Sequence, residues 1–213
     1  MDKLRVGVIG CGGHAQSHFQ MIAAEPRLHL AGIAEIDPKR LADNTARHCP
    51  ERSFADHRQL LDECNLDLVH VTTLPVHLTA LVVECLGRGL HVSVEKPPGM
   101  NAAETAQMAQ AAHQSKGKAL ISFNRRYIPQ VLAVRRQLKA AGGTIQCSTT
   151  YHKNQSILGQ WRSAGLIPDP VICDAIHHVD LLRWLAGAGQ DRAALPVSVY
   201  SEVEDGKRPA AHR

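Results

Sequence analysis

Two short groups of residues carry side chains that are suited to proton transfer. Glu95-Lys96-Pro97 directly follows a short apolar strand, residues 91–94. The triplet is therefore expected at the C-terminal edge of a buried sheet, where open α/β folds bind their ligands. Asp174, His177 and Asp180 are spaced three residues apart, and residues with this spacing lie along one side of a helix. Because lysine and histidine are common acid–base groups, both groups are candidates for catalysis.

A glycine-rich turn near the start of the chain fits a dinucleotide-binding pattern. Gly10-Cys11-Gly12-Gly13-His14-Ala15 lies between an apolar run, Leu4–Ile9, and an expected helix that continues to about residue 24. In the pattern G-x-G-x-x-(G/A) the first glycine permits a tight turn and the second lets the backbone approach a pyrophosphate. The small sixth residue permits close packing of helix on strand. Such turns also occur simply as turns, but the flanking strands and helix favour a cofactor site.

Glu35 follows the second expected strand, residues 28–34. An acid at this position of a dinucleotide-binding unit accepts hydrogen bonds from the adenosine ribose, and its charge repels a 2′-phosphate. NAD is therefore the expected cofactor. Lys39 and Arg40 follow closely; they would favour NADP if their loop folded over the ribose, or they form an exposed first helical turn. NADP stays open as an alternative.

The spacing of apolar residues predicts an α/β fold up to about residue 123. Short β-branched runs are typical of buried parallel strands, and they alternate with segments that have apolar residues at helical spacing. Such alternation predicts a doubly wound parallel sheet with helices on both faces, here a Rossmann dinucleotide-binding domain over residues 1–123. The expected strands are residues 4–9, 28–34, 68–72, 92–94 and 119–123, and the clearest helices are residues 78–88 and 102–116.

The pattern changes after residue 123. Residues 124–213 predict a short α+β substrate domain. A two-stranded sheet is marginal and leaves an exposed edge unless a helix or another chain covers it. We therefore expect a natural short form, a fragment or a truncated product, and a homo-oligomer through the C-terminal sheet is one way to cover the edge. The expected elements are a helix at 129–140, strands at 144–151 and 197–203, a polar loop at 152–170 and a helix at 174–185.

The composition is that of an ordinary globular protein. Of 213 residues, 44% are hydrophobic and 21% are charged, and the basic residues behind the net charge of +4 are scattered among acids. Nucleic acid is therefore not an expected partner. The six cysteines show no C-x-x-C spacing and predict reduced thiols, and His152, His177 and His178 lack zinc-site spacing, so no metal is expected. No apolar signal or membrane span is found, which predicts a cytoplasmic protein.

Five segments together resemble the glucose-fructose oxidoreductase and inositol dehydrogenase family, often written Gfo/Idh/MocA. Each segment is modest alone, but their order and spacing are specific, and the resemblance covers residues 4 to about 203. The family usually carries a larger second domain than this chain offers. The segments are VGVIGCGGHA at 6–15, TLPVH at 73–77, VEKP at 94–97, FNRRYIP at 123–129 and HHVDLLRWL at 177–185.

The resemblance implies a role for each catalytic candidate. The family's E-K-P lysine lies beside the nicotinamide and the reacting carbon, so Lys96 would stabilise the developing oxyanion and assist proton transfer, with Glu95 holding its charge and orientation. The family's main acid–base group is a histidine three residues before an aspartate, which His177 and Asp180 reproduce. His178 is a second candidate if the register differs.

The segment before His177 departs from the family pattern. The family often has an aspartate four residues before the histidine, where this chain has Cys173, and Asp174 follows one place later. Asp174 therefore either reaches the site from a slightly rotated position or serves as the N-cap of the helix.

The resemblance and the polar loop also imply the binding residues. His77 either contacts the cofactor or packs locally at a helix start, and Arg126 either holds substrate or fixes the domain junction. The expected cofactor-binding residues are Gly10, Gly12, Gly13, His14, Ala15, Glu35, Thr73, Pro75, His77, Glu95 and Lys96. The expected substrate-binding residues are Lys96, Arg126, Tyr151, Trp161, Arg162 and His177.

The family resemblance implies hydride transfer between a nicotinamide and a secondary alcohol of a sugar, cyclic polyol or sugar derivative. Two alternatives stay open. One is a non-catalytic dinucleotide-binding sensor or an inactive truncated form, which the short second domain favours. The other is an NAD-dependent glycosidase, a chemistry that also occurs in this family.

Overall fold

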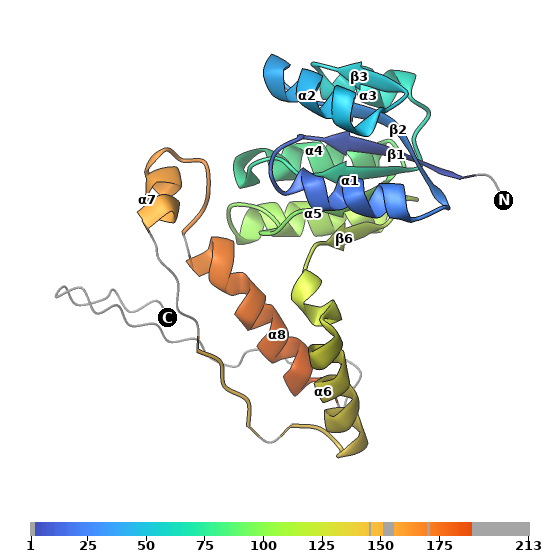
Figure 1. Cartoon of the computed structure of the whole chain (residues 1–213). Helices are drawn as coiled ribbons and strands as arrows, with labels where there is room; N and C mark the ends of the chain where they lie inside the picture. Colours follow the sequence, from blue (N-terminus) through green and yellow to red (C-terminus); the bar gives the residue numbers. More distant parts are fainter. Residues whose placement is uncertain (1–2, 145, 151–155, 170, 189–213) are drawn as a thin grey trace. The chain divides into compact units, whose positions relative to one another are not determined.

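Figure 1 shows the computed structural model of the chain, which describes residues 3–144, 146–150, 156–169 and 171–188. The chain divides into two compact units. The first unit holds residues 1–123 and 153–176, and the second holds residues 124–152 and 177–213. Residues 153–176 group with the first unit, whereas the sequence assigns them to the second domain. The predicted domains, residues 1–123 and 124–213, stay a prediction.

Six parallel strands form the sheet of the first unit, in the order β3-β2-β1-β4-β5-β6. This is the strand order of a doubly wound Rossmann fold, in which winding reverses beside the first strand. It confirms the predicted fold class. The strands are β1 (Leu4–Ile9), β2 (Leu28–Ala34), β3 (Arg52–Phe54), β4 (Leu68–Val71), β5 (His91–Val94) and β6 (Ala119–Ile121).

Helices cover both faces of this sheet (Figure 1). On one face, Phe19 and Ile22 of α1 pack with Val6 and Val8 of β1. On the other face, buried side chains of α3, α4 and α5 pack against the central strands. Two covered faces explain why the central strands are continuous apolar runs. The helices are α1 (Ala15–Ala24), α2 (Pro38–His48), α3 (His57–Glu63), α4 (Pro75–Gly87) and α5 (Ala102–Gln114).

The described part of the second unit is helical. A 3-10 turn, η1 (Asn124–Tyr127), leads into α6 (Pro129–Ala140), and α8 (Ile176–Ala186) is the later helix. The π-helical turn that precedes α8, η2 (Val171–Ala175), belongs to the first unit. The guanidinium of Arg135 lies 4.5 Å from the centroid of the Trp184 ring, so α6 contacts α8. No described helix is both long and apolar enough to cross a bilayer.

Three sequence predictions differ from the structure or fall outside it. The strand expected at 144–151 is absent from residues 144 and 146–150, and no strand of the described second unit is there to pair with it. The polar loop expected at 152–170 contains a helix, α7 (Ser156–Ser163). The strand candidate at 197–203 lies outside the described residues.

Candidate active site

The glycine turn between β1 and α1 leaves open space where a cofactor phosphate would bind. Gly10 has a φ of +86°, and a Cβ there would lie 2.8 Å from the Thr73 methyl carbon and 3.2 Å from the Thr72 carbonyl oxygen. Only glycine fits this position. A Cβ at Gly12 or Gly13 would instead meet no described atom within 4 Å. The protein itself therefore does not require glycine at these two positions, and the space suits the close approach of a pyrophosphate.

The start of α1 also suits a phosphate. Ala15 is fully buried, so the helix packs closely on the sheet, as the G-x-G-x-x-(G/A) pattern requires. In the described chain, the exposed side chain of His14 forms no capping hydrogen bond. The N-terminus of α1 thus lacks a side-chain cap of its own, and an anion would be stabilised there.

Glu35 follows β2, and three donors hold its buried carboxylate. The backbone N–H groups of Cys11 and Asp37 donate to it at 2.8 and 2.9 Å, and the guanidinium of Arg40 donates at 3.0 Å. Burial alone would raise the pKa of Glu35, but these donors outweigh it and hold the pKa below its ordinary value. The carboxylate is therefore charged at neutral pH and fixed beside the glycine turn. Arg40 also lies 3.5 Å from Asp37, so its charge is directed toward two carboxylates.

Lys96 follows β5 and contacts residues that come much later in the chain. Its Nζ donates to the carbonyl oxygen of Cys173 at 3.2 Å and lies 3.9 Å from Oδ1 of Asp174. The side chains of Lys96 and Asp174 are 15% and 8% exposed, so their charges are poorly screened. Asp174 lies within η2 rather than at the N-cap of α8. These contacts favour the alternative in which Asp174 reaches the lysine.

In the second unit, His177 and Asp180 lie near the start of α8, and both are buried. The carboxylate of Asp180 accepts a hydrogen bond from Nε of Arg126 at 2.7 Å and another from its Nη2. The hydrogen bonds with Asp180 raise the pKa of Arg126. A bidentate pair fixes geometry as well as charge. Its contact therefore favours a role for Arg126 in holding Asp180.

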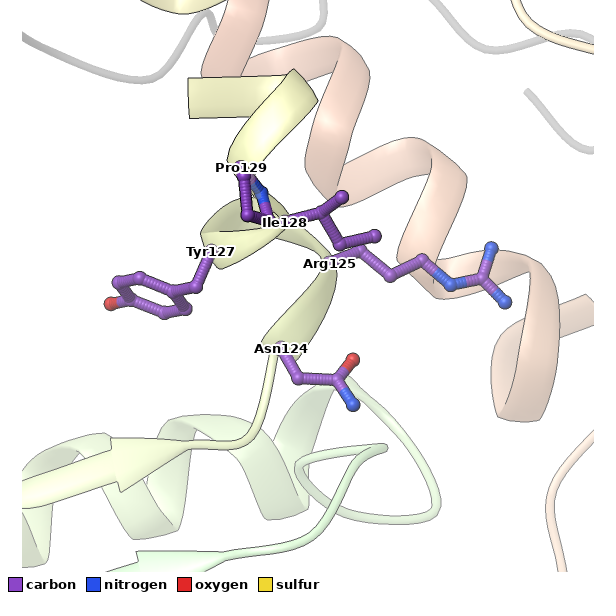
Figure 2. Close-up of a pocket in the computed structure, with 5 residues that line it drawn as sticks. All are labelled: Asn124, Arg125, Tyr127, Ile128 and Pro129. Carbon is purple, nitrogen blue, oxygen red and sulfur yellow. The ribbon is translucent and has the colours of Figure 1, made fainter. Parts of the chain in front are cut away.

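The neighbouring arginine, Arg125, contacts His178. Its Nη1 lies 2.7 Å from Nε2 of His178, and Oγ1 of Thr149 lies 2.8 Å from Nδ1 of the same ring. Because a guanidinium can only donate, Nε2 accepts and the Nδ1–H donates to the threonine hydroxyl. His178 is committed to these contacts, which favours His177 as the acid–base histidine. Figure 2 shows a pocket at η1 and the start of α6, which is lined by Asn124, Arg125, Tyr127, Ile128 and Pro129.

Three further cofactor candidates lie where β4 leads into α4. Thr73 is half-buried in the connection, Pro75 is buried at the first position of α4, and His77 is exposed in the first turn of that helix. All three are at the carboxyl end of the sheet, where Lys96 also lies. Their roles remain predictions. Because His77 is exposed, a contact with the cofactor fits it better than local packing does.

Two of the expected substrate-binding residues lie on α7 of the first unit. Trp161 and Arg162 are exposed on α7, and Arg162 forms an ion pair with Asp169 at 3.1 Å. Tyr151 lies outside the described residues. Among the described residues, no cluster of three or more histidine, cysteine or carboxylate side chains is arranged to hold a metal.

His18 lies beside the E-K-P triplet and was not among the residues predicted for the site. Its Nε2 lies 3.0 Å from Oε1 of Glu95, and the two side chains are 14% and 15% exposed. The only signal in the sequence is its position on α1, three residues after Ala15 and next to Phe19. A polar residue beside two core residues is unusual unless it has a partner.

Comparison with known proteins identifies the family. Residues 4–123 match the Gfo/Idh/MocA family, described as an oxidoreductase family with an NAD-binding Rossmann fold. The chain belongs to this family, which confirms the resemblance and the cofactor class inferred from the sequence.

The relatives are dehydrogenases of sugars and polyols. Inositol 2-dehydrogenase of Burkholderia multivorans is 28% identical over 193 residues, which are 86% of this chain and 55% of that protein. Levoglucosan dehydrogenase of Pseudarthrobacter phenanthrenivorans is 27% identical over 208 residues, 88% of this chain and 52% of that protein. The chain thus spans about half the length of the curated relatives it matches.

One solved structure supports the fold independently. The WlbA dehydrogenase of Bordetella pertussis, in complex with NADH and UDP-GlcNAcA, matches with a TM-score of 0.76 at 23% identity. The match covers 86% of this chain and 58% of that one. At this identity the likeness shows the fold, and it agrees with the strand order described above.

Proposed function

We propose that this chain carries the catalytic residues of an NAD-dependent dehydrogenase that acts on a secondary alcohol of a sugar, cyclic polyol or sugar derivative. The observation that carries the proposal is the position of Lys96. Its ammonium group lies at the carboxyl end of the parallel sheet, largely buried and 3.9 Å from a carboxylate. An ammonium in such a site stabilises negative charge that develops on a substrate oxygen.

NAD would be held by the turn after β1 and by Glu35. The open space at Gly12 and Gly13 suits the pyrophosphate, and the charged Glu35 suits the hydroxyls of the adenosine ribose. When bound, the nicotinamide accepts or donates the hydride. Because Arg40 is paired with Glu35 and Asp37, we propose NAD rather than NADP as the preferred cofactor.

We assign proton transfer to His177 and charge stabilisation to Lys96. His177 would take the hydroxyl proton of the substrate during oxidation and return it during reduction. Asp174 would orient the ammonium of Lys96, and Asp180, held by Arg126, would support His177 on α8. Because Lys96 and His177 belong to different units, their joint action is part of the proposal.

The names of the relatives support a polyhydroxylated substrate. They are dehydrogenases of inositol and levoglucosan, which are both rings with several hydroxyl groups. Trp161 and Arg162 on α7 remain candidates for contacts with such a ring, since aromatic and guanidinium groups bind sugars through stacking and hydrogen bonds.

A turnover assay on a panel of cyclic polyols and sugars tests this function. Lys96→Ala is expected to lower kcat/KM on a confirmed substrate by about a hundredfold or more, because it removes the charge beside the reacting oxygen. Lys116→Ala, at an exposed lysine after α5, is the matched control and should keep wild-type turnover. Full turnover by Lys96→Ala would contradict the assignment.

The same assay separates the other two functions. Tight NADH binding without turnover of any compound in the panel would favour a dinucleotide sensor. Cleavage of a glycoside without net change in NADH would favour an NAD-dependent glycosidase.

A further inference from the structure

His18 and His70 form a buried pair of rings beside the strand end that carries Glu95. His70 lies on β4 and is 3% exposed, and His18 lies on α1 with its side chain 14% exposed. The ring centroids are 4.6 Å apart, with the planes tilted by 41°. The Nε2 of His18 also lies 3.0 Å from Oε1 of Glu95, 77 residues away in the sequence. His18 is therefore held by a ring and a carboxylate that come from two neighbouring strands.

The two histidines play different parts in this cluster. Among the described residues, neither ring nitrogen of His70 has a hydrogen-bond partner. Burial, and after it the charge of His18, lowers the pKa of His70 to about 4, so this ring is neutral at pH 7. His70 thus presents an uncharged flat surface to His18 and does not compete for its hydrogen bond. Among the described residues, the carboxylate of Glu95 is therefore the hydrogen-bond partner of the His18 Nε2.

The carboxylate of Glu95 lies among groups that belong to the expected cofactor site. Burial would raise the pKa of Glu95, but the hydrogen bond with His18 and the charges of His18, His14 and Lys96 hold it below its ordinary value. His14 belongs to the glycine turn, and Lys96 is the next residue. With the adenosine bound by Glu35 on the β2 side of β1, as proposed above, the nicotinamide half of the cofactor would extend toward β4 and β5.

We propose that His18 is a positioning residue for the nicotinamide half of the cofactor. Packed against His70, it holds the charged carboxylate of Glu95 at the end of β5, where that carboxylate accepts a hydrogen bond from the ribose next to the nicotinamide. The inference rests on the proposed function, since it requires a bound dinucleotide. It predicts that His18 affects one half of the cofactor and not the other.

The test compares the affinity for NADH with the affinity for ADP, which carries only the adenosine half. His18→Phe keeps a ring against His70 but removes the donor, and it is expected to weaken NADH binding about tenfold while ADP binding changes less than about twofold. His18→Gln places an amide N–H near the position of Nε2 and should recover most of the NADH affinity. His57→Phe is the matched control. Nε2 of His57 lies 3.1 Å from Oε2 of Glu84, so the two side chains form a similar half-buried pair, and this pair is remote from the expected cofactor residues. His57→Phe should leave both affinities unchanged.

Several outcomes would overturn the inference. An equal loss of NADH and ADP binding in His18→Phe would show a purely structural role, and an unchanged NADH affinity would show no role. If His18→Phe does not fold, as judged by circular dichroism, Glu95→Gln takes its place with the same expectation, because it keeps the volume and removes only the charge. A wild-type protein that binds ADP but not NADH would overturn this inference, and one that binds neither would overturn the proposed function as well.

Discussion

The first and second units fix their candidate site residues by different means. In the first unit, Glu35 and Lys96 follow strands β2 and β5, which contribute fully buried apolar side chains such as Ile33 and Val94. In the second unit, η1 and α6, all of whose residues are described, contain no buried residue. There the site is held by polar pairs, of which the Arg126–Asp180 pair is the best-defined.

This difference determines what a mutation should do. Residues at the ends of packed strands are positioned by the backbone, so the loss of one polar contact alters binding more than it alters the fold. A helix held by a few polar pairs has less packing to compensate, so the loss of one pair loosens the whole element. The first unit should therefore be sensitive to steric changes and to a charge that is placed in its core, and the second unit to the loss of a polar pair.

Gly10→Ala gives the largest steric effect that we expect in the first unit. A Cβ at Gly10 would lie 2.8 Å from the Thr73 methyl carbon, and the φ of +86° strains any residue with a side chain. We expect a loss of about 3 kcal/mol of unfolding free energy, measured by urea denaturation. Gly12→Ala is the matched control, because its Cβ meets no described atom within 4 Å. It should keep the stability and weaken only NADH binding; equal destabilisation by both changes would contradict this account of the turn.

His70 makes the first unit sensitive to acid. Its pKa falls from 6.5 to about 4 on folding, so between these values the folded protein binds fewer protons at this ring than the unfolded chain. The contribution of the neutral His70 ring to the free energy of unfolding is therefore fully present above pH 6.5. It is lost as the pH falls toward 4, by about 3 kcal/mol in all. His70→Leu should remove this part of the pH dependence of Tm, whereas His113→Leu, at an exposed position of α5, should retain it. Parallel pH profiles for His70→Leu and the wild type would show that this ring does not titrate with a lowered pKa.

Arg126→Leu tests the second unit. It leaves the carboxylate of Asp180, 9% exposed, without its two guanidinium hydrogen bonds. Because Arg126 itself is about one-third exposed, we expect a loss of about 2 kcal/mol rather than the larger value of a fully buried pair. Amide hydrogen exchange should become faster in α6 and α8 while NADH affinity stays constant. Arg136→Leu, at an exposed arginine of α6, is the control, and faster exchange throughout β1 to β6 would contradict the division between the units.

The sheet was largely predictable because its central strands are buried on both faces. Each such strand is a run of β-branched residues, and the pattern identifies it without knowledge of its neighbours. The edge strand β3 was missed, because Arg52–Phe54 has one buried residue and is a strand only through its pairing with β2. The strand expected at 144–151 failed for the converse reason. Its β-branched residues favour an extended chain, but strand propensity depends on a partner.

The site was predictable in its residue types and less so in its contacts. Spacing and family resemblance select Lys96 and Asp174 as candidates, and their roles stay predictions. For Asp174, no local pattern could choose between a helix cap and a contact with Lys96. That choice depends on η2, which carries Asp174 to within 3.9 Å of the ammonium. The contact between His18 and Glu95 joins residues 77 apart, and only the packing of α1 on the sheet brings them together.

Glu35→Gln is the smallest change and tests whether the backbone of the first unit alone positions the cofactor. The amide keeps the size of the side chain and removes the charge that repels a 2′-phosphate. It also weakens the hydrogen bond that Arg40 donates to this side chain. We therefore expect the preference for NADH over NADPH to fall about tenfold, while Tm changes little. Titration of both cofactors by fluorescence measures this ratio.

Glu51→Gln is the control for this change, since Glu51 also pairs with an arginine, Arg5, but lies outside the glycine turn. The control should leave the cofactor ratio unchanged. An unchanged ratio in Glu35→Gln as well would mean that the ribose does not meet this carboxylate, and the adenosine half would then have to lie elsewhere along the sheet edge. A fall in the NADH/NADPH preference that is confined to Glu35→Gln would instead show that a single charge decides between the two cofactors. Two backbone N–H groups and Arg40 hold that charge at the end of β2.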